Sequence, residues 1–442
     1  AQAIANRTFT GEWAAAGAVR KLLLADPYAT RLETAIEVLK NLVALRTQAF
    51  DAAFGGWPAS ALVPLLALAA ILDRRHRRLA LPLVLGAIGS IALVSLNSTA
   101  RFQNWRYVTP ALVMLLAAAA LGAAALARRA RRRGVVAGAM VAAAGAAATV
   151  APYRAAERQI DHFARASANI AGQQVEVGKR LAARVPKPRR VFLSDAGAIP
   201  YFSGLPALDG LGLGGFHALP FARASVHGVP AVVELIERMD PSDRPDVLAL
   251  YPSWWRGLAD VFGKRVDGVR IEDNVMCGAD EKVLYDADFS PLAPPGERRP
   301  GAVDELDVAD LVEERAHAYA APVPRGGWVV GAVLALPDGT RRFDAGRIVP
   351  QGREERFVAG PGISPGPATL ALRTDGGPPQ RLRITVERAG HPRATADLEL
   401  AERPAEKWSE ITVHLDDVAS GDIMRMESVI GAYRDFHVWI VR

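Results

Sequence analysis

Four long apolar runs without a charged residue constrain the fold of this chain more than any other feature. They cover residues 52–72, 79–96, 108–127 and 135–151, and each has 17 to 21 residues. A membrane hydrocarbon core about 30 Å thick needs about 20 helical residues, and a helix satisfies its own backbone polar groups in lipid. A soluble helix of this length normally carries a polar face. We therefore expect four membrane-spanning helices within residues 52–152 rather than four buried helices of a large soluble core.

Two arginine tracts predict the orientation of these helices. DRRHRR (73–78) joins the first two runs and RRARRR (128–133) joins the last two; they sum to +8 of a net charge of +6, so all other residues sum to −2. Arginine-rich loops stay in the cytoplasm, which places residues 1–51, the loop 97–107 and everything after 152 on the outer side. The sequence thus predicts a multi-pass inner (cytoplasmic) membrane protein with extracytoplasmic C-terminal domains. No extended basic face remains for a nucleic acid.

The aqueous parts predict three further regions. Residues 1–51 read as an extracytoplasmic helical segment with a break at Asp26-Pro27, and residues 153–293 alternate strand-like runs such as RRVFLSDAG and PDVLALYP with the helical run PAVVELIERM. This alternation is typical of a small α/β domain. Beyond a proline-rich connector, residues 302–442 hold short alternating runs that predict a β-sandwich. The expected fold is multi-domain: an α-helical transmembrane bundle, a small α/β domain and a C-terminal, jelly-roll-like β-sandwich.

The string GLGLGG fits the dinucleotide-binding spacing G-x-G-x-x-G at Gly210, Gly212 and Gly215. That fingerprint requires a helix directly behind the glycines, whose N-terminus meets the pyrophosphate. Here GGFHALPFARASVHG follows, with Pro220 inside it. Extracytoplasmic placement also removes the cofactor pool. We interpret the string as a turn in which the backbone passes close to its neighbours.

The stretch FLSDAGAIPYFSGLPALDG offers Asp195, Tyr201 and Asp209 as candidate substrate-binding residues. Asp195 ends a predicted strand, where ligand sites of α/β sheets collect, and two carboxylates in one pocket could serve acid–base chemistry. The favoured alternative is that both aspartates cap turns beside Gly197 and Gly210.

The loop NSTARFQNWRY offers Arg101, Arg106 and Tyr107 at the outer membrane boundary. Such residues serve as plain interfacial anchors, or the arginines hold a lipid-linked phosphate through charge-assisted hydrogen bonds. Both interpretations stay open.

Other chemistries find little support in the sequence. The eight histidines show no metal-ligand spacing, so no metal site is expected from them. Ser194 does not lie in a G-x-S-x-G elbow, and the single Cys277 excludes an intrachain disulfide.

The segments NWRYVTP, DAGAIPYFSGLPALDGLGL, PDVLALYPSWW, DNVMCG and EKVLYDADF together carry a resemblance. The chain from about residue 9 to 289 resembles the C-terminal half of bacterial GT-C-fold integral membrane glycosyltransferases, a group similar to protein mannosyltransferases and arabinofuranosyltransferases. The tail from about residue 311 resembles carbohydrate-binding jelly-roll modules, as a β-sandwich does.

The resemblance implies transfer of a hexosyl or pentosyl group from a polyprenyl-phosphate donor to a glycan or protein acceptor on the outer face. Members place the catalytic carboxylate in an early outer loop, which would precede Ala1, so the catalytic residues of this chain are unknown. The resemblance is also compatible with a divalent cation in the complete enzyme, but its acidic site is not visible in this sequence, so the cofactor is unknown.

Two other functions compete with this one. A non-enzymatic, membrane-anchored envelope protein that presents glycan- or partner-binding domains would explain the missing catalytic loop and the sandwich. A transporter is disfavoured because the four apolar runs lack the charged residue that a substrate pathway normally needs.

Overall fold

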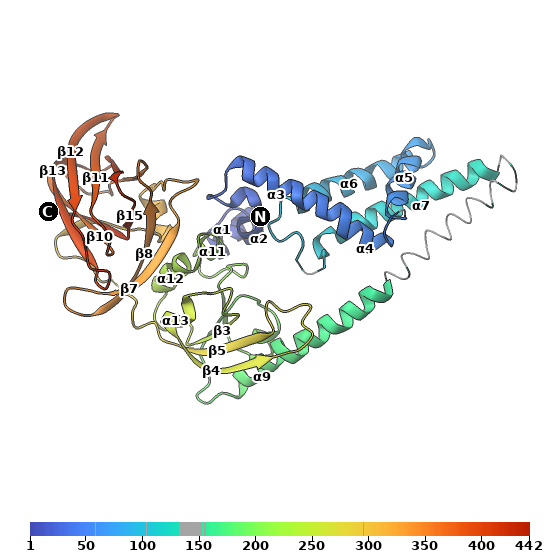
Figure 1. Cartoon of the computed structure of the whole chain (residues 1–442), viewed down its shortest axis with the longest axis horizontal. Helices are drawn as coiled ribbons and strands as arrows, with labels where there is room; N and C mark the ends of the chain where they lie inside the picture. The colour runs from blue at the N-terminus through green and yellow to red at the C-terminus, as the bar shows by residue number, and fades with distance from the viewer. Residues whose placement is uncertain are drawn as a thin grey trace.

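The computed structural model describes residues 1–57, 59–102, 104–131, 156–294 and 296–442, together with 134, 136, 139 and 153. In this part of the chain, the elements gather into three regions (Figure 1). Helices come first, a mixed sheet with helices follows, and antiparallel sheets form the C-terminal region. This order agrees with the predicted succession of helices, α/β layer and β-sandwich.

The N-terminal region is helical, as predicted, and the expected break at Asp26-Pro27 separates η1 from α3. A second break follows α1, where Gly11 ends the helix in the left-handed conformation, with φ 71°. The elements are α1 (Gln2–Thr10), α2 (Ala16–Lys21), η1 (Leu23–Ala25), α3 (Arg31–Ala44), η2 (Leu45–Phe50), α4 (Asp51–Phe54), α5 (Ala59–Leu72), α6 (Arg77–Ser95), η3 (Arg106–Val108) and α7 (Thr109–Arg131).

Two helices of the described residues are long and apolar enough to cross a membrane. They are Arg77–Ser95 and Arg106–Arg131, with mean hydropathies of 1.8 and 2.2. The first predicted run is broken by Gly55 and Gly56, which both adopt positive φ, and leaves only the 14 residues of α5. Nearly all of the fourth run, 135–151, lies outside the described residues. The structure therefore contains two of the four predicted spans by length and composition, and a four-helix membrane bundle is not shown.

The middle region is built on a five-stranded sheet in the order β2-β1-β3-β5-β4. β2, β1 and β3 run parallel, and β5 pairs antiparallel with both β3 and β4. The predicted strands and the helix PAVVELIERM are confirmed as elements. Helical residues 156–169 lead through η4 (Ile170–Val175) to α9 (Glu176–Ala183), followed by β1 (Val191–Leu193), α10 (Ala198–Ser203), β2 (Ala207–Asp209), α11 (Phe221–His227), α12 (Val229–Glu237), β3 (Val247–Leu250), α13 (Leu258–Phe262), β4 (Gly263–Arg270) and β5 (Glu281–Ala287).

The C-terminal region contains three antiparallel sheets, β13-β10-β16-β6, β12-β11-β14-β9 and β15-β8-β7. Alternation places Leu382, Ile384 and Val386 of β11 in a fully buried core, which confirms the predicted sandwich. The elements are β6 (Ala302–Asp307), α14 (Leu311–Ala316), β7 (Val329–Ala335), β8 (Arg341–Val349), β9 (Glu354–Val358), β10 (Gly366–Thr374), β11 (Gln380–Arg388), β12 (His391–Leu400), β13 (Ser409–Val418), β14 (Ile423–Ile430), β15 (Tyr433–Asp435) and β16 (His437–Val441).

Helix α12 joins the middle and C-terminal regions. Pro230 stands at the start of the helix, where its missing N–H has no intrahelical role. Six consecutive residues, 231–236, are buried, because the helix packs on the mixed sheet and also contacts β7 and β8. The same apolar cluster includes Phe343 and Ala345 of β8. One hydrophobic core therefore crosses the boundary between the two regions.

Candidate functional site

A cavity of about 1320 Å³ opens where α12 meets the C-terminal sheets. Its described lining residues come from α12, the connector that follows β5, and the strands β6, β8, β10, β13 and β16. Twelve carboxylate side chains face five arginines and two histidines across this lining. The cavity is thus polar and carries an excess of negative charge.

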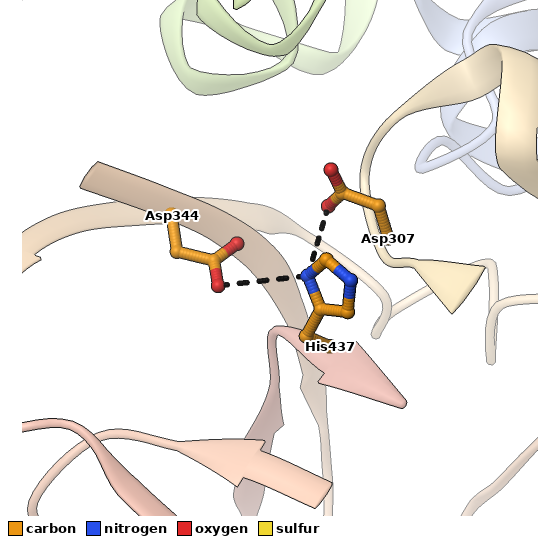
Figure 2. A group of neighbouring side chains, drawn as sticks. All are labelled: Asp307, Asp344 and His437. Carbon is orange, nitrogen blue, oxygen red and sulfur yellow. Dashed lines mark ion pairs between the residues drawn. The ribbon is translucent and has the colours of Figure 1, made fainter. Parts of the chain in front are cut away.

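Three strands bring Asp307, Asp344 and His437 together on the sandwich side of the cavity (Figure 2). His437 Nδ1 lies 3.7 Å from an oxygen of Asp307 and 3.8 Å from one of Asp344. Its Nε2 lies 2.8 Å from Glu305, which fixes the ring orientation. Arg373 donates to Asp344 at 2.8 Å. Asp344 is therefore compensated by a guanidinium as well as by the imidazole.

Glu234 and Glu237 approach the same Asp307 from α12. Helical spacing of three residues places both glutamates on one face. The backbone N–H of Ala345 donates to Glu234 Oε1 at 2.7 Å, and that of Ala293 donates to Glu237 Oε2 at 3.0 Å. Each glutamate thus has one oxygen held in place by a backbone donor.

Desolvation raises the pKa of these three carboxyl groups. Burial is the largest cause for Glu234 and Asp307, whose pKa values rise well above the usual range, and neighbouring carboxylates add to it. Burial raises the pKa of Glu237 to about 7. Burial alone would lower the pKa of His437, but Asp344 and Glu305 outweigh it and raise that pKa. The cluster favours species that bring positive charge to it, a proton or a cation.

Asp195 belongs to a second polar network, at the carboxyl end of β1. Its Oδ1 pairs with Lys282 of β5, a residue with a fully buried side chain. Its Oδ2 accepts from Gln174 at 2.6 Å and from Tyr251 at 3.1 Å. Burial lowers the pKa of Lys282, and Asp195 counteracts that shift. Asp195 is thus an ion-pair partner and does not cap the turn beside Gly197.

Among the described residues, no hydrogen bond joins Asp209 or Tyr201 to Asp195. Asp209 is buried and accepts from the backbone N–H groups of Leu211 and Leu213 at 3.0 and 3.1 Å, which is the turn-capping role. Burial raises the pKa of Asp209, and Asp195 adds to the shift. Tyr201 is 81% exposed on α10. Of these three residues, only the two aspartates interact electrostatically.

Arg106 and Tyr107 belong to η3, at the start of the helix that continues as α7, whereas Asp195 and Asp209 belong to the middle region. Arg106 donates to Tyr107 Oη at 2.9 Å, and Lys21 of α2 donates to the same oxygen at 3.1 Å. Arg101 is exposed in the preceding loop. The predicted site residues therefore lie at two separate locations. Lys21, which donates to Tyr107 as Arg106 does, is a cation that the sequence analysis did not single out.

The glycine string forms a closely packed turn, as interpreted from the sequence. Gly212 adopts φ +72°, and a Cβ there would lie 2.0 Å from the backbone nitrogen of Ala222. A Cβ on Gly215 would lie 2.3 Å from the carbonyl oxygen of Phe9. No helix opens directly behind the string, since α11 begins only at Phe221.

Sequence reasoning missed the cluster at the cavity because its members come from separate elements. One local signal existed: Glu234 interrupts the apolar run AVVELI, which has no polar face on which to place it. Lys282 gives the same signal in EKVLY, a run that forms a buried central strand. A charge within such a run indicates a partner from elsewhere in the fold.

Comparison with known proteins gives a local match and distant structural likenesses. A family described as a domain of unknown function (DUF8728) matches residues 168–293, which are 126 of the 442 residues. No curated protein matches the chain.

Several solved carbohydrate-binding modules are similar to part of the chain. The C-terminal family 6 module of LamC, a marine laminarinase from Zobellia galactanivorans, is 13% identical over 31% of this chain and 98% of that one, with a TM-score of 0.22. A module of Cellvibrio mixtus lichenase 5A in complex with cellotriose is 12% identical over 32% and 98%, also at 0.22. A family 35 module from Clostridium thermocellum is 13% identical over 32% and 99%, at 0.23. At these identities and TM-scores, the likeness does not say what this chain binds.

The pair Asp195–Lys282 predicts an asymmetric response to mutation. Asp195→Asn leaves the buried ammonium of Lys282 without its counter-ion and should lower the free energy of unfolding by about 3 kcal/mol. Lys282→Met fills the same space with apolar atoms, while Asp195 keeps the donors Gln174 and Tyr251, so the loss should be about 1 kcal/mol. Urea unfolding followed by tryptophan fluorescence measures both values. A larger loss for Lys282→Met than for Asp195→Asn would contradict this account.

Proposed function

We propose that this chain is a membrane-anchored protein that binds a glycan in the cavity between α12 and the sandwich. The cavity is the observation that carries the proposal. At about 1320 Å³ it exceeds the roughly 300–1,000 Å³ of typical small-molecule pockets, so it has room for several sugar units. Its lining of carboxylates and guanidiniums is unlike the mainly apolar lining of such pockets.

The chemistry of the lining suits a polyhydroxylated ligand. Each sugar hydroxyl offers one donor and two acceptor sites; ionised carboxylates only accept and guanidiniums only donate. The side chains are held in advance by one another: Arg373 donates to Asp344 and to Glu410, at 2.8 and 2.9 Å. Fixed groups lose little conformational freedom on binding. The excess of carboxylates favours neutral or amino sugars over uronic acids.

The membrane anchor is part of the proposal and rests on two supports. Two helices have the length and hydropathy of spans. The two arginine tracts lie next to each other. Arg128 of the second tract donates to Asp73 of the first at 3.2 Å and lies 2.9 Å from His76, so both tracts are at the same end of the helices. The glycan-binding domains then lie beyond the opposite end, on the outer side of the membrane.

Narrowing the cavity tests the glycan proposal. Val303 of β6 lines the cavity and is 46% exposed, so Val303→Trp obstructs it without disturbing the core. Val266 of β4 is 42% exposed and does not line it, which makes Val266→Trp a matched control. On an array of neutral, amino and acidic oligosaccharides, we expect the wild type to bind neutral or amino sugars.

Val303→Trp should weaken that binding at least about tenfold, or about 1.4 kcal/mol, while Val266→Trp should leave it unchanged. Equal binding by both variants, or a preference for uronic acids, would overturn the proposal.

A second candidate function is the one that the GT-C resemblance implies, transfer of a sugar from a polyprenyl-phosphate donor. The cations Lys21 and Arg106 favour it. Both donate to Tyr107 Oη, and in the described part of the chain no carboxylate oxygen lies within 4.0 Å of either. Two uncompensated cations at the outer end of a membrane helix suit a phosphate group.

Replacing both cations tests this candidate. The double variant Lys21→Met/Arg106→Met should weaken binding to vesicles that contain a polyprenyl phosphate by more than about tenfold, because a phosphate contact between charged groups is lost. Arg129→Met, at the opposite end of α7, is the control and should bind as the wild type does. Vesicle co-sedimentation with and without the polyprenyl phosphate measures both. Unchanged binding by the double variant would remove the support for a glycosyltransferase.

A further inference from the structure

We propose that Glu234, Glu237 and Asp307 hold a divalent cation, Ca²⁺, that ties α12 to the first strand of the sandwich. One carboxylate oxygen from each residue lies within 4.8 Å of the others. This is the separation expected of ligands around one ion at 2.3–2.6 Å. The inference concerns the cavity wall and stands whether or not a glycan binds there.

The charges around the cluster place the deficit of positive charge at the two glutamates, since Asp307 has the imidazole of His437 3.7 Å away. Arg373 and His437 compensate Asp344, and Arg238 pairs with Asp310 at 2.6 Å. In contrast, across the described ranges, neither Glu234 nor Glu237 has a lysine, arginine or histidine nitrogen within 4.0 Å. A buried carboxylate without such compensation is costly.

The side chain of Glu234 gives independent support for a ligand. It is only 2% exposed, so it is removed from bulk water. Ala345 N–H holds its Oε1, and among the described residues no hydrogen-bond donor meets its Oε2. Glu234 lines the cavity, and one of its carboxylate oxygens lies within 4.8 Å of oxygens of Glu237 and Asp307. A nearly fully buried acceptor without a donor calls for an ion or a proton in the adjoining space.

Asp307 supplies the ligand from the sandwich. One of its oxygens is directed at His437 Nδ1, and the other points away from the imidazole (Figure 2). The oxygen that faces the imidazole is Oδ1, which lies 3.7 Å from His437 Nδ1, is fully enclosed and has no hydrogen-bond partner. His437 is held in turn by Glu305 at 2.8 Å. Its imidazole faces Oδ1 of Asp307, and Oδ2, which accepts no hydrogen bond from the described residues, is left for the cation.

Three carboxylates select the kind of cation. Oxygen ligands of this type suit Ca²⁺, which accepts irregular geometry and water as further ligands. The cavity gives room for those waters. Because Glu234 and Glu237 belong to α12 and Asp307 to β6, the ion would bridge the two regions and rigidify the wall of the cavity.

The test uses the full-length chain in detergent, treated with a chelator and free of any glycan. Calorimetric titration with CaCl₂ should show one site per chain, and Tb³⁺ should give luminescence sensitised by Trp439, whose ring stacks on His437 at 4.3 Å. Asp307→Asn and Glu234→Gln should each weaken Ca²⁺ binding by at least about tenfold, since each removes one charged ligand. Asp240→Asn is the control: this exposed residue lines the same cavity outside the cluster.

Thermal unfolding separates a lost ligand from a failed fold. Ca²⁺ should raise the Tm of the wild type and of Asp240→Asn with increasing concentration. Glu234→Gln should fold, melt no lower than the chelator-treated wild type because an uncompensated buried carboxyl group is removed, and need at least about tenfold more Ca²⁺ for the same rise in Tm. A wild type without a Ca²⁺ site, or an equal loss of binding in Asp240→Asn and Asp307→Asn, would overturn the inference while leaving the glycan proposal untouched.

Discussion

The burial of α12 on two sides is the constraint on which the site depends. The helix presents an apolar surface to the mixed sheet and another to β7 and β8. A helix of nine residues is not stable on its own in water, so its position comes from this packing. Because the packing is shared, the glutamates on α12 are carried to carboxylates of the sandwich. The cavity and its charge are consequences of that contact.

The N-terminal segment reinforces the same junction. Glu12 accepts from Arg223 in a bidentate pair at 2.7 and 2.9 Å and from Arg315 at 3.3 Å. Tyr28 lies 2.7 Å from His227, and burial lowers the pKa of that histidine to about 3. These contacts join the segment before the apolar helices to both the middle region and the C-terminal region. The cavity is thereby held at a defined place relative to the proposed membrane anchor.

Local sequence patterns were sufficient to predict the helices and strands, but not to predict the acidic cluster at the cavity. The short alternating runs predicted strands such as β13, whose Ile411, Val413 and Leu415 pack on the sandwich core, and the helical run PAVVELIERM predicted α12. Asp195 was found because strand ends can be located in a sequence. The sequence did not indicate that Glu234 and Asp307 lie close together. They are 73 positions apart in the chain, and spacing rules describe only residues that are near one another in the sequence. Long-range packing creates such clusters, and one sequence does not reveal it.

Hydrogen–deuterium exchange of Phe343→Ala tests the shared core most directly. Phe343 of β8 packs on Phe262 of α13, with ring centroids 5.3 Å apart, and its truncation should cost about 3–5 kcal/mol. If one core joins the two regions, exchange should rise in peptides of α12 and α13 as well as in β8. A rise confined to residues 302–442 would show that the sandwich is independent, and would contradict the account of the cavity.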